Sequence, residues 1–335
     1  MLKYPPRLPL AQLPTPLQPL RRLQHREGGP LIWLKRDDMT GATLSGNKVR
    51  KLEFILAQAQ LEGFDAVITC GGIQSNHCRA TALAAAQLGF ACHLILRGMP
   101  EHGQPAQGNH LLDELAGASI EYAAPKEYFA GLDDIFRRQI DQYERLGKKA
   151  LAIPTGGSNG IGIWGYIEAT RELMDDCVAL AFDPTAIICA SGSGGTQAGL
   201  TVGAAIYCSG AKVYGINVCD DEDYFVNKVS ADVEQWRQIY PEASAHLKQG
   251  PLGIHVIGGY VGAGYGQADK DVFDTIKMLG ALEGVVLDPV YTGKAFDGLL
   301  KEIRQGRFAD EKNLIFVHTG GVFGLAPYAA DLSVG

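Results

Sequence analysis

Residues 66–88 read AVITCGGIQSNHCRATALAAAQL and contain, in order, a short apolar run, a polar loop with two glycines and an apolar helical pattern. The run over 66–70 is short and bounded by glycine, which predicts a buried strand, and the spacing from His77 onward predicts a helix over 77–88. A strand that leads through a short loop into a helix is the repeating unit of parallel sheets. This stretch therefore predicts an α/β fold.

The same alternation continues over most of the chain. Continuous apolar strands that alternate with helices indicate mostly parallel sheets with helices on both faces. No internal repeat or long linker is present, so a second domain must be interwoven with the first. Further strands are expected over 91–96, 150–153, 185–190, 212–218 and 313–318, and further helices over 48–62, 108–116, 131–146, 160–174, 195–208, 268–282 and 293–304.

Composition narrows the class of protein. The 335 residues carry a net charge of −7, which argues against nucleic acid or an anionic membrane as a partner. No apolar segment approaches ~18 residues, so no membrane span is expected. The seven cysteines are odd in number and form no C-x-x-C, which indicates reduced, buried thiols in a cytoplasmic protein. The histidines lack paired ligand spacing, and no metal site is expected.

Lys48 lies in the run LSGNKVRKLEF (44–54), at the start of an expected helix. Gly46 lets the backbone come close to a bound group. The positive helix end, with Arg50 and Lys51 nearby, is expected to lower the pKa of the Lys48 ammonium. A lysine that is neutral part of the time is a nucleophile toward aldehydes.

Two other interpretations of Lys48 remain. Most lysines in a first helical turn are simply solvated. A P-loop lysine that grips a phosphate is disfavoured, because Asn47 intervenes before the lysine and Val49 replaces the Ser or Thr that would hold magnesium.

The loop SGSGGTQ (191–197) follows one expected strand and opens a helix. Its small residues let backbone N–H groups converge, its hydroxyls add donors, and the helix supplies a positive end. The dinucleotide pattern G-x-G-x-x-G fails because Gln197 occupies the third glycine position. The loop therefore favours a monophosphate over a dinucleotide, with a merely tight turn as the simpler alternative.

Other polar loops follow other strands at the edge where parallel sheets bind ligands. They are residues 71–77, 154–160 and 318–321. In the first, Ser75, Asn76 and His77 could bind a carboxylate and a phenolic oxygen, although Ser75 or Asn76 alone could be an N-cap and His77 alone could serve packing. A nucleophilic lysine, a phosphate loop and a carboxylate loop on one α/β frame suggest pyridoxal phosphate and an amino acid.

At this point the chain resembles the D-cysteine desulfhydrase / 1-aminocyclopropane-1-carboxylate (ACC) deaminase family of fold-type II, tryptophan-synthase-β-like pyridoxal-phosphate enzymes. The resemblance spans nearly the whole chain. The segments that carry it are 32–38, 45–54, 71–77, 154–165, 190–199, 284–294 and 317–321. It implies a larger cofactor-binding domain from residues 1–50 and 158–335, and a smaller α/β domain over 51–157 that carries the carboxylate loop.

The resemblance also implies a role for each site residue. Lys48 would bond the cofactor covalently and take the substrate's α-proton, and Asn76 would face the cofactor's phenolic oxygen. Ser75, with Asn76 and His77, would hold the substrate carboxylate. The remaining implied residues are Asn47, Ser193, Gly194, Gly195, Thr196 and Thr319 at the cofactor, and Tyr265, Tyr291 and Thr292 at the substrate.

Two positions separate the branches of this family. ACC deaminases carry a glutamate where this chain has Thr292 and a leucine where it has Thr319, whereas the D-cysteine desulfhydrase branch resembles this chain. A threonine hydroxyl would leave the cofactor a weaker electron sink than a carboxylate would. The resemblance thus implies a homodimeric lyase that converts D-cysteine to pyruvate, ammonia and hydrogen sulfide. ACC deaminase, L-cysteate sulfo-lyase and a non-catalytic pyridoxal-phosphate carrier or sensor stay open as alternatives.

Overall fold

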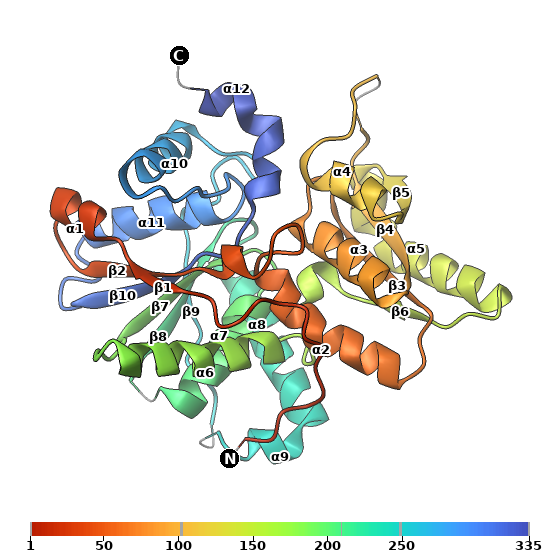
Figure 1. The fold of residues 1–335 in the computed structure, drawn as a ribbon, viewed down its shortest axis with the longest axis horizontal. Helices are drawn as coiled ribbons and strands as arrows, with labels where there is room; N and C mark the ends of the chain where they lie inside the picture. Colours follow the sequence, from red (N-terminus) through yellow and green to blue (C-terminus); the bar gives the residue numbers. More distant parts are fainter. Residues whose placement is uncertain (1, 101–102, 209, 248–249, 334–335) are drawn as a thin grey trace.

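The computed structural model describes residues 2–100, 103–208, 210–247 and 250–333, and it contains two sheets that lie side by side (Figure 1). The larger sheet has six strands in the order β1-β2-β10-β7-β8-β9, and the smaller has four in the order β5-β4-β3-β6. Every described pairing is parallel except β1 with β2. The expected α/β fold with parallel sheets flanked by helices is confirmed.

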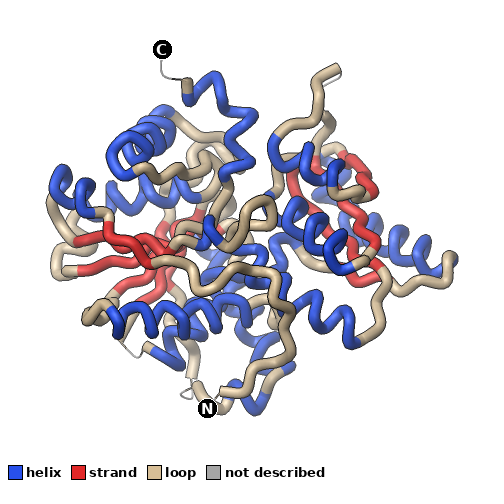
Figure 2. The backbone as a smooth tube through the Cα atoms, in the orientation of Figure 1, coloured by secondary structure: helices blue, strands red, loops and turns tan. Residues whose placement is uncertain are grey.

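The strands are short, and Figure 2 shows them as two groups enclosed by helices. In the larger sheet they are β1 (Leu17–Pro19), β2 (Leu31–Lys35), β7 (Ala186–Ser191), β8 (Lys212–Asn217), β9 (His255–Ile257) and β10 (Asn313–Val317). In the smaller sheet they are β3 (Ala66–Gly72), β4 (Ala91–Arg97), β5 (Ser119–Ala123) and β6 (Ala150–Ala152).

The helices cover both faces of each sheet. They are α1 (Arg21–Glu27), α2 (Asn47–Leu61), α3 (Asn76–Leu88), α4 (Gly108–Leu115), α5 (Pro125–Arg145), α6 (Trp164–Ala179), α7 (Gly195–Tyr207), α8 (Glu222–Ile239), α9 (Pro241–Ser244), α10 (Lys270–Glu283), α11 (Thr292–Arg304) and α12 (Ala329–Leu332). Short 3-10 turns occupy Asp37–Met39, Thr155–Gly157 and Val322–Tyr328. None of these helices is both long and apolar enough to cross a membrane.

Successive residues of a strand point to opposite faces of the sheet, so their contacts show which helices cover each face. In β7, Ile188 packs with residues of α1, α10 and α11, whereas its neighbour Ile187 packs with residues of α6 and α7. The smaller sheet is covered by α2 and α3 on one face and by α5 on the other. Because both faces are apolar, β3, β4 and β6 contain apolar runs that the sequence revealed, whereas the more polar β5 was not expected.

Most expected elements are found within a few residues of their predicted ends. Helix α5 begins at Pro125 instead of residue 131, because proline is favoured at a first helical position and Gly131 only kinks the helix. Helix α6 begins at Trp164 instead of residue 160. Strands β1, β5 and β9 and helices α1, α8, α9 and α12 were not expected from the sequence.

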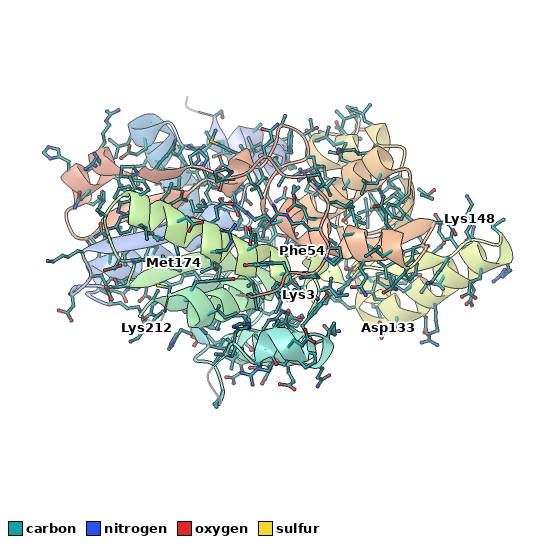
Figure 3. The ribbon with its side chains drawn as sticks, turned by 60° about the horizontal axis from the view of Figure 1, so that its bottom comes forward. Lys3, Phe54, Asp133, Lys148, Met174 and Lys212 are labelled. Carbon is teal, nitrogen blue, oxygen red and sulfur yellow. The ribbon has the colours of Figure 1, made fainter. Side chains whose placement is uncertain are left out.

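Helix α2 lies between the two sheets and joins them (Figure 1). Phe54, near the centre of Figure 3, is buried against Trp164 of α6, with ring centroids 6.4 Å apart, while Leu52 and Leu56 pack into the core of the smaller sheet. Charged side chains such as Asp133 and Lys148 project from the outer edges instead (Figure 3). The start of α2, with Lys48, is therefore anchored to both halves of the molecule.

A buried ionic network fixes the first turn of α2. Arg50 donates from Nε and Nη2 to the two oxygens of Asp37, each at 2.8 Å, and from Nη1 and Nη2 to those of Glu172, each at 3.0 Å. Lys35 lies 2.6 Å from Glu172, and Tyr166 donates to Asp37 at 2.6 Å. Burial alone would raise the pKa of Glu172, but Arg50 and Lys35 lower it to about 2.

We predict that Glu172→Gln lowers the free energy of unfolding at pH 7 by roughly 3–5 kcal/mol, because it leaves Arg50 with half of its buried counter-charge. The pKa of this carboxyl is lowered on folding, so its contribution is present above about pH 4.5 and is lost as the pH falls toward 2. Denaturant unfolding at several pH values measures the difference. The difference in unfolding free energy between wild type and Glu172→Gln should shrink below pH 4.5. Asp175 is exposed on the same helix, so the control Asp175→Asn should lower the free energy of unfolding only slightly. A difference that does not change with pH would contradict the assignment.

Candidate active site

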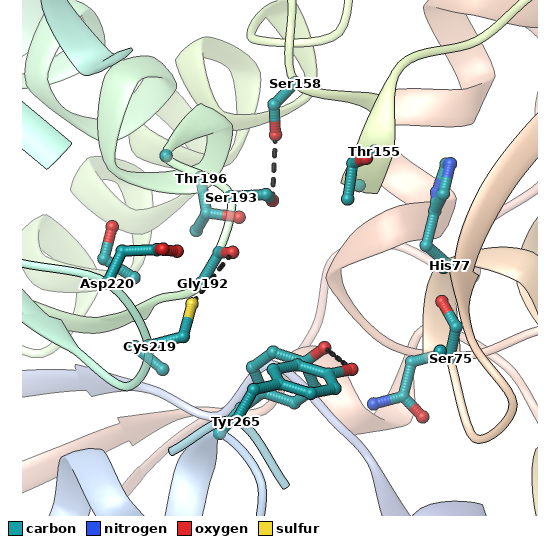
Figure 4. Close-up of a pocket in the computed structure, with 18 of the residues that line it drawn as sticks. Ser75, His77, Thr155, Ser158, Gly192, Ser193, Thr196, Cys219, Asp220 and Tyr265 are labelled. Carbon is teal, nitrogen blue, oxygen red and sulfur yellow. Dashed lines mark hydrogen bonds between the residues drawn. The ribbon is translucent and has the colours of Figure 1, made fainter. Parts of the chain in front are cut away.

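A cavity of about 610 Å³ lies at the carboxyl ends of the parallel strands. Figure 4 shows Ser193 and Thr196 on one side of it and Ser75 and His77 on the other. The predicted site residues that line it are Asn47, Lys48, Ser75, Asn76, His77, Ser193, Gly194, Thr196, Tyr265, Tyr291 and Thr319. Gly195 and Thr292 were also predicted, but they do not line this cavity.

Lys48 is the second residue of α2 and is partly buried. Gly46 has φ +91°, and a Cβ there would lie 2.8 Å from the carbonyl oxygen of Thr319, which accepts the N–H of Asn47 at 3.1 Å. The loop after β10 thus holds the start of the helix. Only glycine accommodates that approach.

The pKa of Lys48 is lowered to about 8, as the sequence predicted, but for a different reason. Burial of the ammonium is the main cause, and the thiols of Cys219 and Cys78 oppose it. Arg50 does not contribute to this shift, because Asp37 and Glu172 neutralise its charge. Sequence spacing cannot show such a distant ion pair.

The side chain of Lys48 and the phosphate loop both come close to Gly156. This residue has φ +69°, and a Cβ on it would overlap Oγ of Ser193 and lie 3.1 Å from Nζ of Lys48. The predicted nucleophile and the predicted phosphate donor therefore approach the same point of the cavity. Any side chain at position 156 would fill that point.

The phosphate loop is braced by hydroxyls and an amide. Asn47 donates from Nδ2 to Oγ1 of Thr196 at 2.9 Å, and Ser158 donates to Oγ of Ser193 at 2.9 Å. The N–H of Gly195 donates to Oγ of Ser158 at 3.1 Å. Gly195 therefore supports the loop and does not line the cavity. The loop turns at Gly194, whose φ is +82°.

Two lysines lie behind this loop. Lys51 is buried and donates to the carbonyl of Gly156 at 3.1 Å, and Lys228 donates to the carbonyl of Ser158 at 3.2 Å. Asp232 pairs with Lys228. Burial, with Lys48 nearby, lowers the pKa of the Lys51 ammonium well below its usual value, so a bound anion would favour its charged form. Hydroxyls and a helix N-terminus suit a phosphate dianion, and these residues fit a phosphorylated cofactor.

Ser158 and Lys228 were not predicted from the sequence, and Lys51 was expected only as a neighbouring charge of Lys48. The glycine-rich loop over 154–160 was a usable signal for Ser158. No sequence pattern marks Lys228, since it lies on α8, which was itself unexpected.

On the opposite side, Ser75 is both the N-cap of α3 and a lining residue. Its Oγ accepts the N–H of Cys78 at 3.2 Å, so the capping interpretation is also correct. Asn109 donates from Nδ2 to Oδ1 of Asn76 at 2.9 Å. This bond orients the Asn76 amide and leaves its nitrogen as a donor toward the cavity.

His77 donates through Nε2 and leaves Nδ1 as an acceptor. Thr69 donates its hydroxyl proton to the carbonyl of Ile153 at 2.9 Å, so the 2.8 Å contact with His77 must use the imidazole's Nε2–H as donor. Burial, with Lys48 and Lys51 nearby, lowers the pKa of His77 well below its usual value. Its Nδ1 has no hydrogen-bond partner among the described residues. A neutral acceptor does not attract a carboxylate, so the geometry gives no support to that role.

A pair of tyrosines closes the cavity. The hydroxyls of Tyr265 and Tyr291 are 2.7 Å apart, and both rings are partly buried (Figure 4). Burial raises the pKa of Tyr265 to about 12 and that of Tyr291 well above its usual value. Both hydroxyls therefore keep their protons near neutral pH. Lys294 donates to the carbonyls of Val261 and Gly264 at 2.6 and 2.8 Å, which holds the Tyr265 loop.

Thr292 does not contribute its hydroxyl to the cavity. It is fully buried, donates to Oδ1 of Asp288 at 2.7 Å and accepts the N–H of Asp288 at 2.9 Å. Asp288 also accepts the N–H groups of Val290 and Tyr291, each at 2.9 Å. Of the two threonines that distinguish the branches, only Thr319 lines the cavity.

The chain is similar to known proteins over nearly its whole length. The family described as pyridoxal-phosphate dependent enzymes matches residues 8–320. The chain is 40% identical to the bifunctional D-cysteine desulfhydrase/1-aminocyclopropane-1-carboxylate deaminase, mitochondrial, of Arabidopsis thaliana, over 94% of this chain and 78% of that protein. It is 40% identical to a D-cysteine desulfhydrase of Klebsiella pneumoniae, over 98% and 97% of the two chains. The crystal structure of an ACC deaminase homologue superposes with a TM-score of 0.88 at 34% identity, covering 98% of this chain and 95% of that one.

We predict that Thr196→Val weakens cofactor binding by roughly 1–3 kcal/mol, because it removes a hydroxyl donor from the phosphate loop. Turnover at saturating cofactor should change less, since the hydroxyl is remote from the reacting bonds. Titration of the apoprotein with pyridoxal phosphate measures the loss. Thr201→Val is the matched control, because Thr201 is buried on the same helix and its hydroxyl has no described partner. Equal affinities for the two variants would contradict the phosphate assignment.

Proposed function

Because the chain belongs to the pyridoxal-phosphate dependent enzyme family, we propose that it is a carbon–sulfur lyase that acts on D-cysteine. With water, D-cysteine would give pyruvate, ammonia and hydrogen sulfide. The observation that carries the proposal is the meeting of Lys48 and Ser193 over Gly156, which puts the nucleophile beside the phosphate loop. The names of the relatives support the reaction class.

The cofactor would be held by its phosphate at Ser193, Gly194 and Thr196, with Lys51 and Lys228 behind the loop. Asn76, oriented by Asn109, would donate to the phenolic oxygen. When bound, pyridoxal phosphate withdraws electrons from the substrate's α-carbon and makes its proton removable.

Lys48 would take that proton. A base works best when its pKa lies near the operating pH, and burial brings the pKa of Lys48 to about 8. Ser75 and the donor nitrogen of Asn76 would orient the substrate carboxylate. The N–H groups at the start of α3 would add a positive potential that also attracts the carboxylate.

Tyr265 and Tyr291 would serve the leaving group. Both keep their protons, so the pair can hydrogen-bond to a thiolate as the carbon–sulfur bond breaks. A carrier or sensor of pyridoxal phosphate would not need this pair, which favours an enzyme.

The choice of D-cysteine rests on Thr319 and on the named relatives. Thr319 offers a neutral hydroxyl at the cavity wall, which suits a reaction with a good leaving group better than the opening of a cyclopropane ring. Thr292 carries no weight in this choice, since Asp288 occupies its hydroxyl. ACC and L-cysteate are therefore the alternatives that an assay must separate.

We also propose that the protein works as a cytoplasmic homodimer. All seven cysteines are free and six of them are buried, which suits a reducing compartment. The dimer rests on the family resemblance alone. Light scattering on the purified protein would test it.

Purified protein loaded with pyridoxal phosphate should form pyruvate and sulfide from D-cysteine far faster than pyruvate from L-cysteine or L-cysteate, or 2-oxobutyrate from ACC. Lys48→Ala should abolish all of these activities, because the base and the covalent anchor are lost together. Coupled assays for the oxo acids, with a separate assay for sulfide, measure the panel.

A preference for ACC over D-cysteine would refute the proposed substrate. A preference for L-cysteate would keep the reaction class and change the leaving group. Cofactor binding without turnover of any substrate would favour the carrier.

A further inference from the structure

We propose that Arg97 is a specificity residue that binds a negative charge on the β-substituent of amino-acid ligands of this cavity. The ligand class is amino acids whose β-substituent is a sulfonate or a carboxylate. The inference rests on the proposed function, because it assumes that an amino acid occupies the cavity beside Lys48.

Arg97 is the last residue of β4 and lines the cavity. In the sheet it pairs with Gly72, at the start of the carboxylate loop. A Cβ on Gly72 would lie 3.4 Å from Cε1 of Tyr265 and 4.0 Å from Nη2 of Arg97. The guanidinium and the Tyr265 ring therefore share one corner of the cavity.

Three aromatic rings hold the guanidinium. Its carbon lies 4.8 Å from the ring centroid of Tyr265, 4.9 Å from that of Phe129 and 5.5 Å from that of Tyr128. Aromatic faces attract a cation without neutralising it. Among the described residues, none forms an ion pair or a hydrogen bond with the guanidinium of Arg97, so its charge and its side-chain N–H donors remain available.

The other charges of the cavity have different environments. Lys228 pairs with Asp232 beside the phosphate loop, and Lys48 lies over Gly156. Asp220 also lines the cavity, but its side chain is exposed and no ion pair with Arg97 is formed. Arg97 is thus the cation on the Tyr265 side.

The position fits the far end of a substrate. An amino acid with its α-carbon near Lys48 and its carboxylate at Ser75 and Asn76 extends its β-substituent toward Tyr265 and Tyr291. Arg97 lies over Tyr265 and can meet a charged group there. The planar guanidinium suits a sulfonate or carboxylate, which accepts two parallel hydrogen bonds.

Aspartate and asparagine test this inference, because they have nearly the same shape and differ in the charge of the β-substituent. The affinity of the loaded enzyme for each enantiomer of both, and of cysteate, is measured from the change in cofactor absorption and from inhibition of pyruvate formation. Wild-type enzyme should bind aspartate and cysteate about tenfold or more tightly than asparagine, since hydrogen bonds to charged groups contribute roughly 1.5–3 kcal/mol.

Arg97→Met should remove this preference and change the affinity for asparagine by less than about threefold. Arg97→Lys should retain part of the preference, because it keeps the charge but loses the planar fork. Equal losses for aspartate and asparagine would overturn the inference, since Arg97 would then bind the shared α-carboxylate or only support the fold. Equal affinities in the wild type would overturn it as well.

These results are separable from the proposed function. The absorption change reports binding even without turnover, so a charge preference that depends on Arg97 can be measured if D-cysteine is not a substrate. Conversely, turnover of D-cysteine with no charge preference would refute only the role of Arg97.

Discussion

Arg50 forms ion pairs with the carboxylates of Asp37 and Glu172, and the position of the site residues depends on these two ion pairs. Asp37 follows β2 and Glu172 lies on α6, so their bonds to Arg50 join α2 to two elements of the larger half. Lys48 lies two residues before Arg50. A displaced first turn of α2 would move Lys48 away from Gly156 and would break the bond from Asn47 to Thr196. The network also removes a positive charge from the neighbourhood of Lys48, which leaves burial as the main influence on its pKa.

The fold was predictable where strands are buried on both faces and helices have one apolar side. Strands β3, β4, β7, β8 and β10 are mostly buried, and each contains an apolar run that the sequence shows. Strands β1 and β9 have only three residues each, and Gln18, Pro19 and His255 interrupt any apolar run there, whereas the equally short β6 is wholly apolar and was predicted. Helix α8 begins at Asp221, whose side chain accepts the N–H of Tyr224 at 2.7 Å, a cap that the sequence analysis did not use.

The site was predictable as a set of loops but not as a set of contacts. Glycine, serine and threonine at strand ends identified the phosphate loop, and Lys48 was recognisable from its helix start. The burial of Thr292 against Asp288 was not, because it depends on the path of one turn. The role of Ser158 and the rings around Arg97 are tertiary features of the same kind, since they bring together residues that are far apart in the chain.

Lys48 is the residue proposed to bond the cofactor, and burial keeps its amine partly neutral near pH 8. The direct measurement is the rate at which apoprotein captures pyridoxal phosphate as a function of pH, followed by borohydride reduction and peptide mapping. Only the neutral amine attacks the aldehyde, so the rate should rise through a midpoint near pH 8, with the reduced cofactor on Lys48. A midpoint near the ordinary lysine value of 10.5, or a cofactor attached to Lys51 or Lys228, would contradict it.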